Sequence, residues 1–381
     1  MTGRVSTPTV IIGAGPSGLA VAACLKKRGL GYTLLDAADR VGDAWHRHYE
    51  RLHLHTARAL SSLPHLPMPA SWPTYPSRAQ VASYLQTYSD ALGLEPRLGV
   101  RVARAERQAG AWLVDCVGGP DYRADSLVVA TGYNAVPSLA SWPGLDTFPG
   151  EVLHSSRYKN GKHLSGQRVL VIGSGNSGAE IAIDLWEHGA QPAMSIRGPV
   201  HVVPRDLLGV PAQRVTVALS HLPARVADRL SQPLRQTLIG DLRPWGIQRP
   251  DVGPLELLET KGRVPLIDVG TVALIKQGSI KVYPDVRAVA GKSVELVDGR
   301  KVEVDAIVMA TGYKSGLERW LVGADAVLDA RGLPRLHGKE SALGRLWFCG
   351  FRNPTTGALR ESGIEAQRIA KALAHVQPAV A

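Results

Sequence analysis

The sequence of 381 residues predicts an α/β fold that contains two units of similar design. A glycine motif occurs twice, each time after a short apolar run typical of a buried strand and before a run of helical character. The two copies are Gly13-Ala14-Gly15-Pro16-Ser17-Gly18 and Gly173-Ser174-Gly175-Asn176-Ser177-Gly178. A strand, a G-x-G-x-x-G turn and a helix in this order form a Rossmann-like, dinucleotide-binding unit. Glycines that serve turn geometry alone are the weaker alternative.

The other elements of the first unit follow from apolar periodicity and turn residues. The run Thr9–Ile12 predicts the first strand, Leu19–Arg28 the helix, and Tyr32–Leu35 a second strand that ends at Asp36. A Pro-rich loop follows, and then we expect a helix over residues 77–92 and strands over 101–107, 111–117 and 126–130.

The second unit repeats this order about 160 residues later along the chain. Arg168–Ile172 and Ala193–Ile196 predict strands on either side of a helix at Ala179–His188. A strand at Leu346–Gly350 and a helix from about Ser362 indicate that the chain returns to its first domain. The expected domains are residues 1–150 with 315–381, which form a discontinuous unit, and residues 163–312.

The residue beyond the second strand of each unit indicates which nucleotide the unit prefers. Asp36 lies 18 residues after Gly18, where a carboxylate accepts ribose hydroxyls and repels a 2′-phosphate, so the first unit suits FAD or NAD. Arg197 holds the matching place, 19 residues after Gly178, and no carboxylate occurs from 193 to 199. A guanidinium suits a phosphate dianion, so the second unit suits NADPH; a solvated arginine is the alternative.

Composition excludes several classes of protein. The net charge of +11 comes from scattered Arg and Lys rather than from a basic patch, so a nucleic-acid partner is not expected. No apolar run approaches the ~20 residues of a membrane span, and a cytoplasmic protein is expected. Cys24, Cys116 and Cys349 are far apart in the sequence and form neither a C-x-x-C pair nor a metal cluster. A disulfide reductase is therefore excluded.

A third motif lies before the second glycine turn and identifies a family. Phe148 to Tyr158 fits F-x-G-x-x-x-H-x-x-x-Y, with His154 at its centre. This is the fingerprint of the class B flavin-containing monooxygenases, which the sequence resembles. Related Baeyer–Villiger enzymes carry Trp-Pro at the end of the motif, whereas this chain has Tyr158-Lys159. The difference disfavours the ketone-oxidising branch.

Within that class the sequence is most similar to the plant YUCCA group, the indole-3-pyruvate monooxygenases. The similar stretches are residues 51–55, 148–161, 168–185, 200–205, 246–257, 265–270 and 310–320. The resemblance implies FAD, NADPH and O₂, a C4a-(hydro)peroxyflavin, and oxidative decarboxylation of an aryl 2-oxo acid such as indole-3-pyruvate. The chain departs from the group at Thr56-Ala57-Arg58 and at 352–360, so amine or sulfide oxygenation of a small-molecule substrate stays open.

The resemblance also implies the site residues. His55 is the candidate catalytic residue, as a hydrogen-bond donor near the flavin; the alternative is a histidine that packs in the core or lines the cofactor. His154 is expected to be structural. Besides the glycine motifs, Asp36, His55 and Arg197, the expected cofactor-binding residues are Arg40, Trp45, Thr56, Val102, Thr131, Gly132, Thr311, Gly312, Tyr313 and Gly350.

Two further hypotheses concern surfaces and partners. Apolar residues recur at helical spacing over 219–242, which predicts core packing; a lid or a membrane-surface contact is the alternative. A flavoprotein reductase that passes electrons to an acidic protein partner is the alternative function from another class, and an NADPH oxidase that releases H₂O₂ is a weaker one. No metal site is expected, and a homodimer is an open question.

Overall fold

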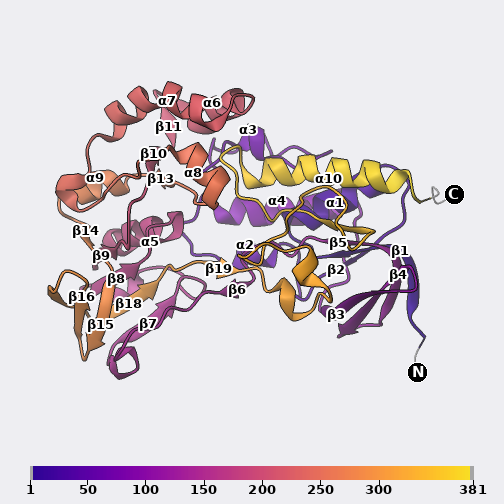
Figure 1. Ribbon diagram of the computed structural model, residues 1–381, viewed down its shortest axis with the longest axis horizontal. Helices are drawn as coiled ribbons and strands as arrows, with labels where there is room; N and C mark the ends of the chain where they lie inside the picture. The colour runs from indigo at the N-terminus through magenta and orange to yellow at the C-terminus, as the bar shows by residue number, and fades with distance from the viewer. Residues whose placement is uncertain (1–2, 378–381) are drawn as a thin grey trace. The chain divides into compact units, whose positions relative to one another are not determined.

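The computed structural model describes residues 3–377, which form two compact units (Figure 1). Unit 1 comprises the described residues up to His46, residues Thr56–Val136 and those from Tyr313 on. Unit 2 comprises Arg47–His55 and Pro137–Gly312. Each unit has its own sheet and its own buried core.

Unit 1 is built on a six-stranded sheet with the order β2-β1-β5-β4-β3, in which β20 also pairs with β5. Parallel pairing joins β1 (Val5–Ile12), β2 (Thr33–Leu35), β5 (Tyr122–Val129) and β20 (Leu346–Phe348). An antiparallel hairpin of β3 (Arg101–Gln108) and β4 (Ala111–Val117) completes the sheet. The first four residues of β1 are exposed or half-buried. Its last four, which form the apolar run of the sequence, are buried.

Three helices accompany this sheet. α1 (Pro16–Lys26) starts with a proline. An N–H at the first position of a helix has no intrahelical acceptor, so the proline costs no hydrogen bond there. It packs against α10 (Ala358–Ala374), which begins before the expected Ser362. α4 (Arg78–Ala91) starts with a capping box between Ser77 and Gln80.

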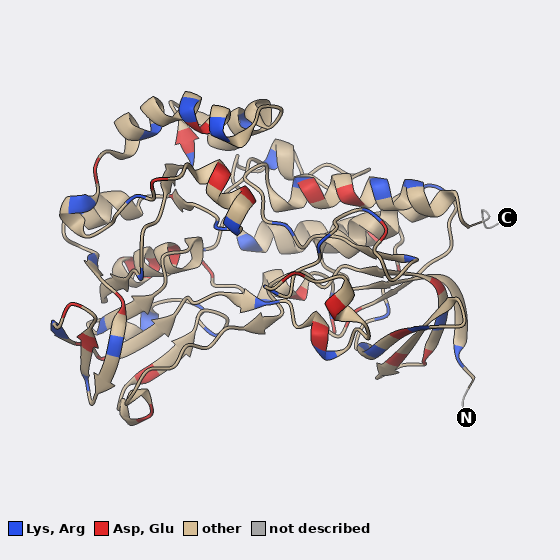
Figure 2. Ribbon diagram, in the orientation of Figure 1, with Lys and Arg blue, Asp and Glu red and all other residues tan. Residues whose placement is uncertain are grey.

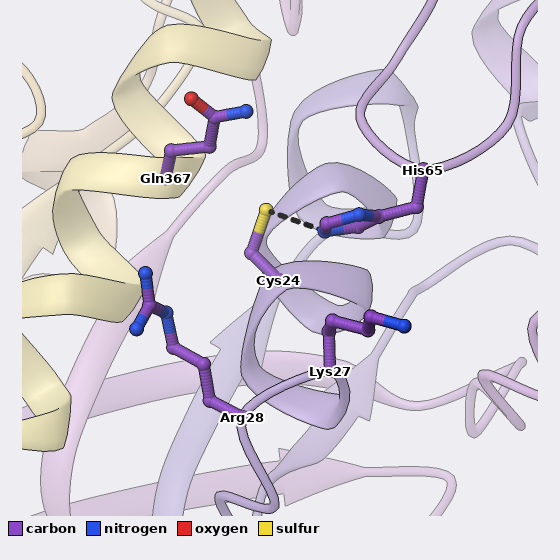
Figure 3. A pocket seen from close by; sticks show the side chains of 5 residues that line it. All are labelled: Cys24, Lys27, Arg28, His65 and Gln367. Carbon is purple, nitrogen blue, oxygen red and sulfur yellow. Dashed lines mark hydrogen bonds between the residues drawn. The ribbon is translucent and has the colours of Figure 1, made fainter.

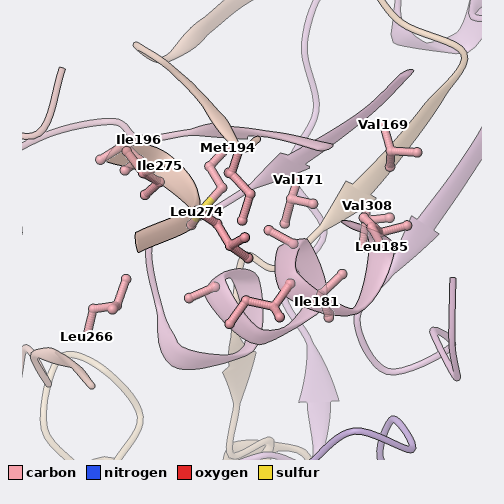
Figure 4. Packing of buried hydrophobic residues seen from close by; sticks show 14 of the residues in the cluster. Val169, Val171, Ile181, Leu185, Met194, Ile196, Leu266, Leu274, Ile275 and Val308 are labelled. Atoms are coloured by element: carbon pink, nitrogen blue, oxygen red, sulfur yellow. The ribbon is translucent and has the colours of Figure 1, made fainter. Parts of the chain in front are cut away.

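Unit 2 contains an all-parallel sheet in the order β14-β9-β8-β18-β7. The strands are β7 (Glu151–His154), β8 (Arg168–Ile172), β9 (Gln191–Ser195), β14 (Lys281–Tyr283) and β18 (Ala306–Met309). Parallel strands need crossover connections, and α5 (Asn176–Glu187) makes the one between β8 and β9. Val171, Met194 and Ile181 bury the strands against α5, with Leu274 of α9 (Thr271–Lys276) beside them (Figure 4).

The remaining elements are mostly short. They are α2 (Asp43–Arg47), α3 (Arg58–Ser61), β6 (Val136–Pro137), η1 (Leu145–Thr147), η2 (Lys162–Leu164), β10 (Val202–Pro204), β11 (Asp206–Leu207), β12 (Val210–Pro211), α6 (Ala212–Leu219), α7 (Ala224–Ile239), η3 (Arg243–Trp245), α8 (Pro254–Lys261), β13 (Leu266–Asp268), β15 (Val286–Ala290), β16 (Ser293–Leu296), β17 (Lys301–Glu303), β19 (Tyr313–Lys314), η4 (Leu317–Arg319) and η5 (Ala324–Ala326).

The apolar stripe around α7 is exposed or half-buried, so the expectation of core packing is wrong. Val226 is 43% and Leu230 62% exposed. The buried face of α7 carries Asp228 instead, whose carboxylate accepts hydrogen bonds from the backbone N–H groups of Leu255 and Glu256 at the start of α8. Because these bonds place Asp228 on the buried face of α7, the apolar stripe lies on the opposite, exposed face.

The unit boundaries differ from the expected domain boundaries at two places. Residues 137–150 belong to unit 2, because Trp142, Leu145 and Phe148 pack on the cluster beneath its sheet. The segment Arg47–His55 also belongs to unit 2, where Tyr49 is buried in the core next to α5. Sequence order alone had placed both segments in the first domain.

No helix within residues 3–377 is both long and apolar enough to cross a bilayer. Figure 2 shows Lys and Arg distributed over the elements of both units among Asp and Glu. Cys24, Cys116 and Cys349 are free thiols, and no group of acidic, histidine or cysteine side chains in the described part of the chain is arranged to hold a metal.

Candidate cofactor and active site

Two glycines of the first turn are tightly surrounded, and the third faces open space. A Cβ on Gly13 would lie 2.6 Å from the carbonyl oxygen of Ala130, and a Cβ on Gly18 would lie 1.7 Å from that of Gly13. A Cβ on Gly15 would meet nothing within 4 Å. The turn therefore needs two glycines for its own packing and leaves open space at the third, at the start of α1, where a phosphate group fits.

Other predicted residues of unit 1 surround this turn. The carboxylate of Asp36 accepts hydrogen bonds from the N–H groups of Ala14, at 2.5 Å, and Ala38, at 2.8 Å. Thr131 adjoins Gly13, and its hydroxyl is buried without a hydrogen-bond partner. Gly350 lies against α1, where a Cβ would come within 1.9 Å of Ser17 Oγ.

Five more predicted residues lie at varying distances from the turn. Gly42 donates its N–H to the carbonyl of Ala14, which brings the loop with Arg40 and Trp45 to the turn. Val102 lies on β3, which follows the bond between Val100 N–H and the carbonyl of Asp36. Thr56 instead bonds Ser61 Oγ, and Gly132 follows Thr131 with a φ of +74°. The loop with Arg40 and Trp45 therefore lies at the turn.

The second turn has the same construction. A Cβ on Gly173 would lie 2.3 Å from the carbonyl oxygen of Ala310, and one on Gly178 would lie 2.4 Å from that of Gly173. A Cβ on Gly175 would again meet nothing within 4 Å. The side-chain Oδ1 of Asn176 accepts a hydrogen bond from Ile267 N–H, a contact that the motif alone does not reveal. Both turns thus offer an open cradle at the start of a helix.

Arg197 lies just beyond β9 and is exposed. Within the described residues its guanidinium has no ion-pair partner, so it is available to an anion. Ser174 and Ser177 belong to the turn and its helix, while Thr311 donates its hydroxyl to the carbonyl of Ser138. Tyr313 is the first residue of the last segment of unit 1.

The fingerprint residues are anchored inside unit 2. His154 is buried, and its ring nitrogens lie 3.0 Å from Ser156 Oγ and 3.1 Å from the carbonyl oxygen of Gly312. Burial lowers the pKa of His154 and so favours its neutral ring. Tyr158 donates its hydroxyl to Asp184 at 2.5 Å, and burial raises the pKa of that hydroxyl. Both side chains hold the linker to the sheet and to α5.

His55 contacts a residue that the sequence analysis missed. Its Nε2 hydrogen bonds to the carboxylate of Glu180 on α5, inside unit 2. Glu180 also accepts the hydroxyl of Tyr49 at 3.4 Å. The available signal was a carboxylate in the apolar first half of the helix that follows the second glycine turn.

A separate pocket lies in unit 1 at the opposite end of α1 from Gly15 (Figure 3). Cys24, Lys27, Arg28, His65 and Gln367 line its volume of about 330 Å³. Cys24 Sγ lies 3.7 Å from His65 Nε2, and burial raises the pKa of this thiol to about 11. The thiol is therefore protonated near neutral pH, and the pocket is distinct from both glycine turns.

Comparison with known proteins agrees with this geometry. The family described as pyridine nucleotide-disulphide oxidoreductase matches residues 10–206. The chain is 41% identical to indole-3-pyruvate monooxygenase YUCCA1 of Oryza sativa subsp. japonica, over 95% of this chain and 90% of that one. It is 39% identical to YUCCA6 of Arabidopsis thaliana, over 96% and 90%.

Solved structures show the same fold. A flavin-containing monooxygenase from Stenotrophomonas maltophilia matches with a TM-score of 0.74 and 24% identity, covering 98% of this chain and 99% of that one. A bacillithiol disulfide reductase from Staphylococcus aureus matches with a TM-score of 0.71 and 16% identity, over 98% and 100%. The predicted fold class and family are confirmed. The chain therefore belongs to the YUCCA family of flavin-dependent monooxygenases, enzymes that use a flavin and a pyridine nucleotide.

Proposed function

We propose that unit 1 binds FAD and unit 2 binds NADPH. The open cradle at Gly15 supports FAD binding, since it leaves room for a pyrophosphate, and Asp36 has carboxylate lone pairs for ribose hydroxyls. Thr131 would gain a partner for its buried hydroxyl. The cradle at Gly175 and the exposed Arg197 support NADPH, whose 2′-phosphate a guanidinium binds well.

The chain's own residues contribute binding, orientation and exclusion of water. Bound together, the nicotinamide supplies a hydride and the flavin activates O₂. We assign His55 as the hydrogen-bond donor that would hold the activated oxygen when the flavin is bound. His154 and Tyr158 keep the linker in place and take no part in the chemistry.

The reaction that we propose is the oxidative decarboxylation of an aryl 2-oxo acid. The 2-oxo acid, O₂, NADPH and a proton give the acid shortened by one carbon, CO₂, NADP⁺ and water. One oxygen atom of O₂ enters the new carboxylate, and the other leaves as water. The observation that carries this proposal is the likeness to the YUCCA relatives over nearly the whole chain, with the two cradles that such a reaction requires.

A substrate panel tests the proposal. The FAD-loaded enzyme is given NADPH with indole-3-pyruvate, phenylpyruvate, a tertiary amine or a thioether, and product masses and NADPH consumption are measured. We expect the aryl 2-oxo acids to be shortened and the amine and thioether to be left intact. Oxygenation of the amine or thioether with untouched 2-oxo acids would overturn the choice of substrate. Electron transfer to an acidic protein acceptor without any oxygenation would instead indicate a reductase.

A further inference from the structure

A buried carboxylate on α5 binds His55, the histidine that we assign to the activated oxygen. Glu180 is 2% exposed, and its Oε1 contacts both His55 Nε2 and the hydroxyl of Tyr49. Its Oε2 lies 3.5 Å from Arg51 Nη1. Burial raises the pKa of Tyr49 well above its ordinary value, so the tyrosine is neutral and donates its proton. Three side chains of one segment therefore converge on one carboxylate.

The contact fixes which nitrogen of His55 carries the first proton. Because a carboxylate only accepts, Nε2 must donate, and the neutral ring keeps its proton there. Within the described residues no hydrogen bond of Nδ1 is found, and the side chain is 12% exposed. A second proton must then bind at Nδ1, and the resulting positive charge would lie against Glu180.

We propose that Glu180 is the positioning residue of His55. Its carboxylate orients the imidazole, keeps Nδ1 free, and stabilises the state in which Nδ1–H donates a hydrogen bond. This inference deepens the proposed function and rests on it, because His55 serves the oxygen chemistry only if the chain is a flavin monooxygenase. Glu180 itself touches neither the substrate nor the flavin in this account.

The other charged groups around the ring are occupied elsewhere. Asp184, one turn further along α5, accepts hydrogen bonds from the Tyr158 hydroxyl and from a backbone N–H. Glu187 forms an ion pair with Arg51, with the closest N–O distance 2.9 Å. Glu180 is therefore the acidic group in direct contact with His55, and Glu187 provides a matched control on the same helix.

Nitrogen-15 NMR of histidine-labelled holoenzyme tests the proposal without turnover, with His55→Ala used to assign the signals. We expect the neutral wild-type ring to carry its proton on Nε2. In Glu180→Gln a fraction of the neutral rings should carry the proton on Nδ1 instead, because the amide of glutamine can donate to Nε2 as well as accept from it. Glu187→Gln should match the wild type.

Two results would overturn the proposal. One is a neutral wild-type ring protonated on Nδ1, which needs no variant and so does not depend on how Glu180→Gln folds. The other is an unchanged proportion of the two neutral tautomers of His55 in Glu180→Gln compared with the wild type. Neither result depends on catalysis, so they are distinct from failure of the proposed function.

A double-mutant cycle separates positioning from general support of the fold. The readout is H₂O₂ released per NADPH consumed. Glu180→Gln should raise it in the wild-type background and leave it unchanged in the His55→Ala background, because Glu180 acts through His55. An equal rise in both backgrounds would show that Glu180 acts independently of the histidine and would contradict the proposal.

Discussion

Asp36 and Arg197 follow the second strand of two units that have the same construction, and they carry opposite charges. The cradles at Gly15 and Gly175 are alike, so the glycines cannot distinguish the two nucleotides. The residues beyond the strands can, since a carboxylate repels the 2′-phosphate that a guanidinium attracts. We therefore expect Asp36 and Arg197 to determine which nucleotide each unit binds, and His55 to act on the activated oxygen.

Replacing Arg197 by Ala should weaken NADPH binding about tenfold or more and leave NADH binding nearly unchanged. The lost contact is a charge-assisted hydrogen bond worth about 1.5–3 kcal/mol. Dissociation constants from flavin-reduction kinetics measure the effect. Arg287→Ala serves as the control, because this exposed arginine of β15 pairs with Glu295. Equal losses for both nucleotides would show that Arg197 does not bind the 2′-phosphate.

Changing His55 to Ala should increase the H₂O₂ released per NADPH several-fold, while the rate of flavin reduction stays within about twofold. The reason is the loss of a hydrogen bond to the activated oxygen, which forms only after the flavin has been reduced. His53→Ala is the matched control, since His53 lies in the same segment but is exposed and bonds only the carbonyl of Arg51 in the described contacts. Tight coupling in His55→Ala would count against the role of His55.

At the scale of elements, the two strand-turn-helix units were predictable because their requirements are local. Gly13 and Gly18 must lack side chains to avoid backbone atoms within a few residues or at the neighbouring strand end. The pairing of His55 with Glu180 was not predictable, since the two residues are 125 positions apart. The same holds for α7, whose orientation depends on bonds between Asp228 and the start of α8. Contacts of this kind follow from tertiary packing and leave no periodic signal.

Valine at the open glycine of each turn should remove one nucleotide and spare the other. Gly15→Val should yield protein without FAD, because the added side chain fills the space for the pyrophosphate. Gly175→Val should yield yellow protein that NADPH does not reduce. Absorbance spectra of the purified variants and anaerobic reduction by NADPH provide the measurements, and each variant is the control for the other. Exchanged phenotypes would mean that the two units are assigned the wrong way round.

At the scale of the whole molecule, the family and the order of the chain were predictable, whereas the unit boundaries were not. The glycine motifs and the fingerprint are sequence signals of the two sheets and the linker. The assignment of residues 47–55 to unit 2 depends on the burial of Tyr49 beside α5. The sequence predicted that this segment belongs to the first domain, because it lies between elements of that domain. A short segment that packs in another core leaves the order of the motifs along the chain unchanged.

Stability should decrease as the pH falls below about 6.5, the ordinary pKa of a histidine. Burial and then the charge of Arg352 lower the pKa of His337 to about 4 in the folded chain. Between these values the unfolded chain binds a proton that the folded chain does not, so acid favours unfolding. Burial lowers the pKa values of His154 and His201 in the same direction.

Urea unfolding at pH 7 and pH 5 measures this dependence. The decrease in the free energy of unfolding should be about 1 kcal/mol smaller in His337→Gln than in the wild type, allowing for solvent screening of a half-buried ring. The same decrease in both proteins would show that His337 does not contribute.

Turnover under oxygen-18 gas with NADPH and indole-3-pyruvate tests the proposed oxidative decarboxylation directly. We expect one oxygen-18 atom in the carboxylate of the shortened acid, with one CO₂ released per NADPH consumed in a coupled reaction. The same acid formed without oxygen-18, or NADPH oxidised to give H₂O₂ as the only oxygen product with every 2-oxo acid unchanged, would contradict it.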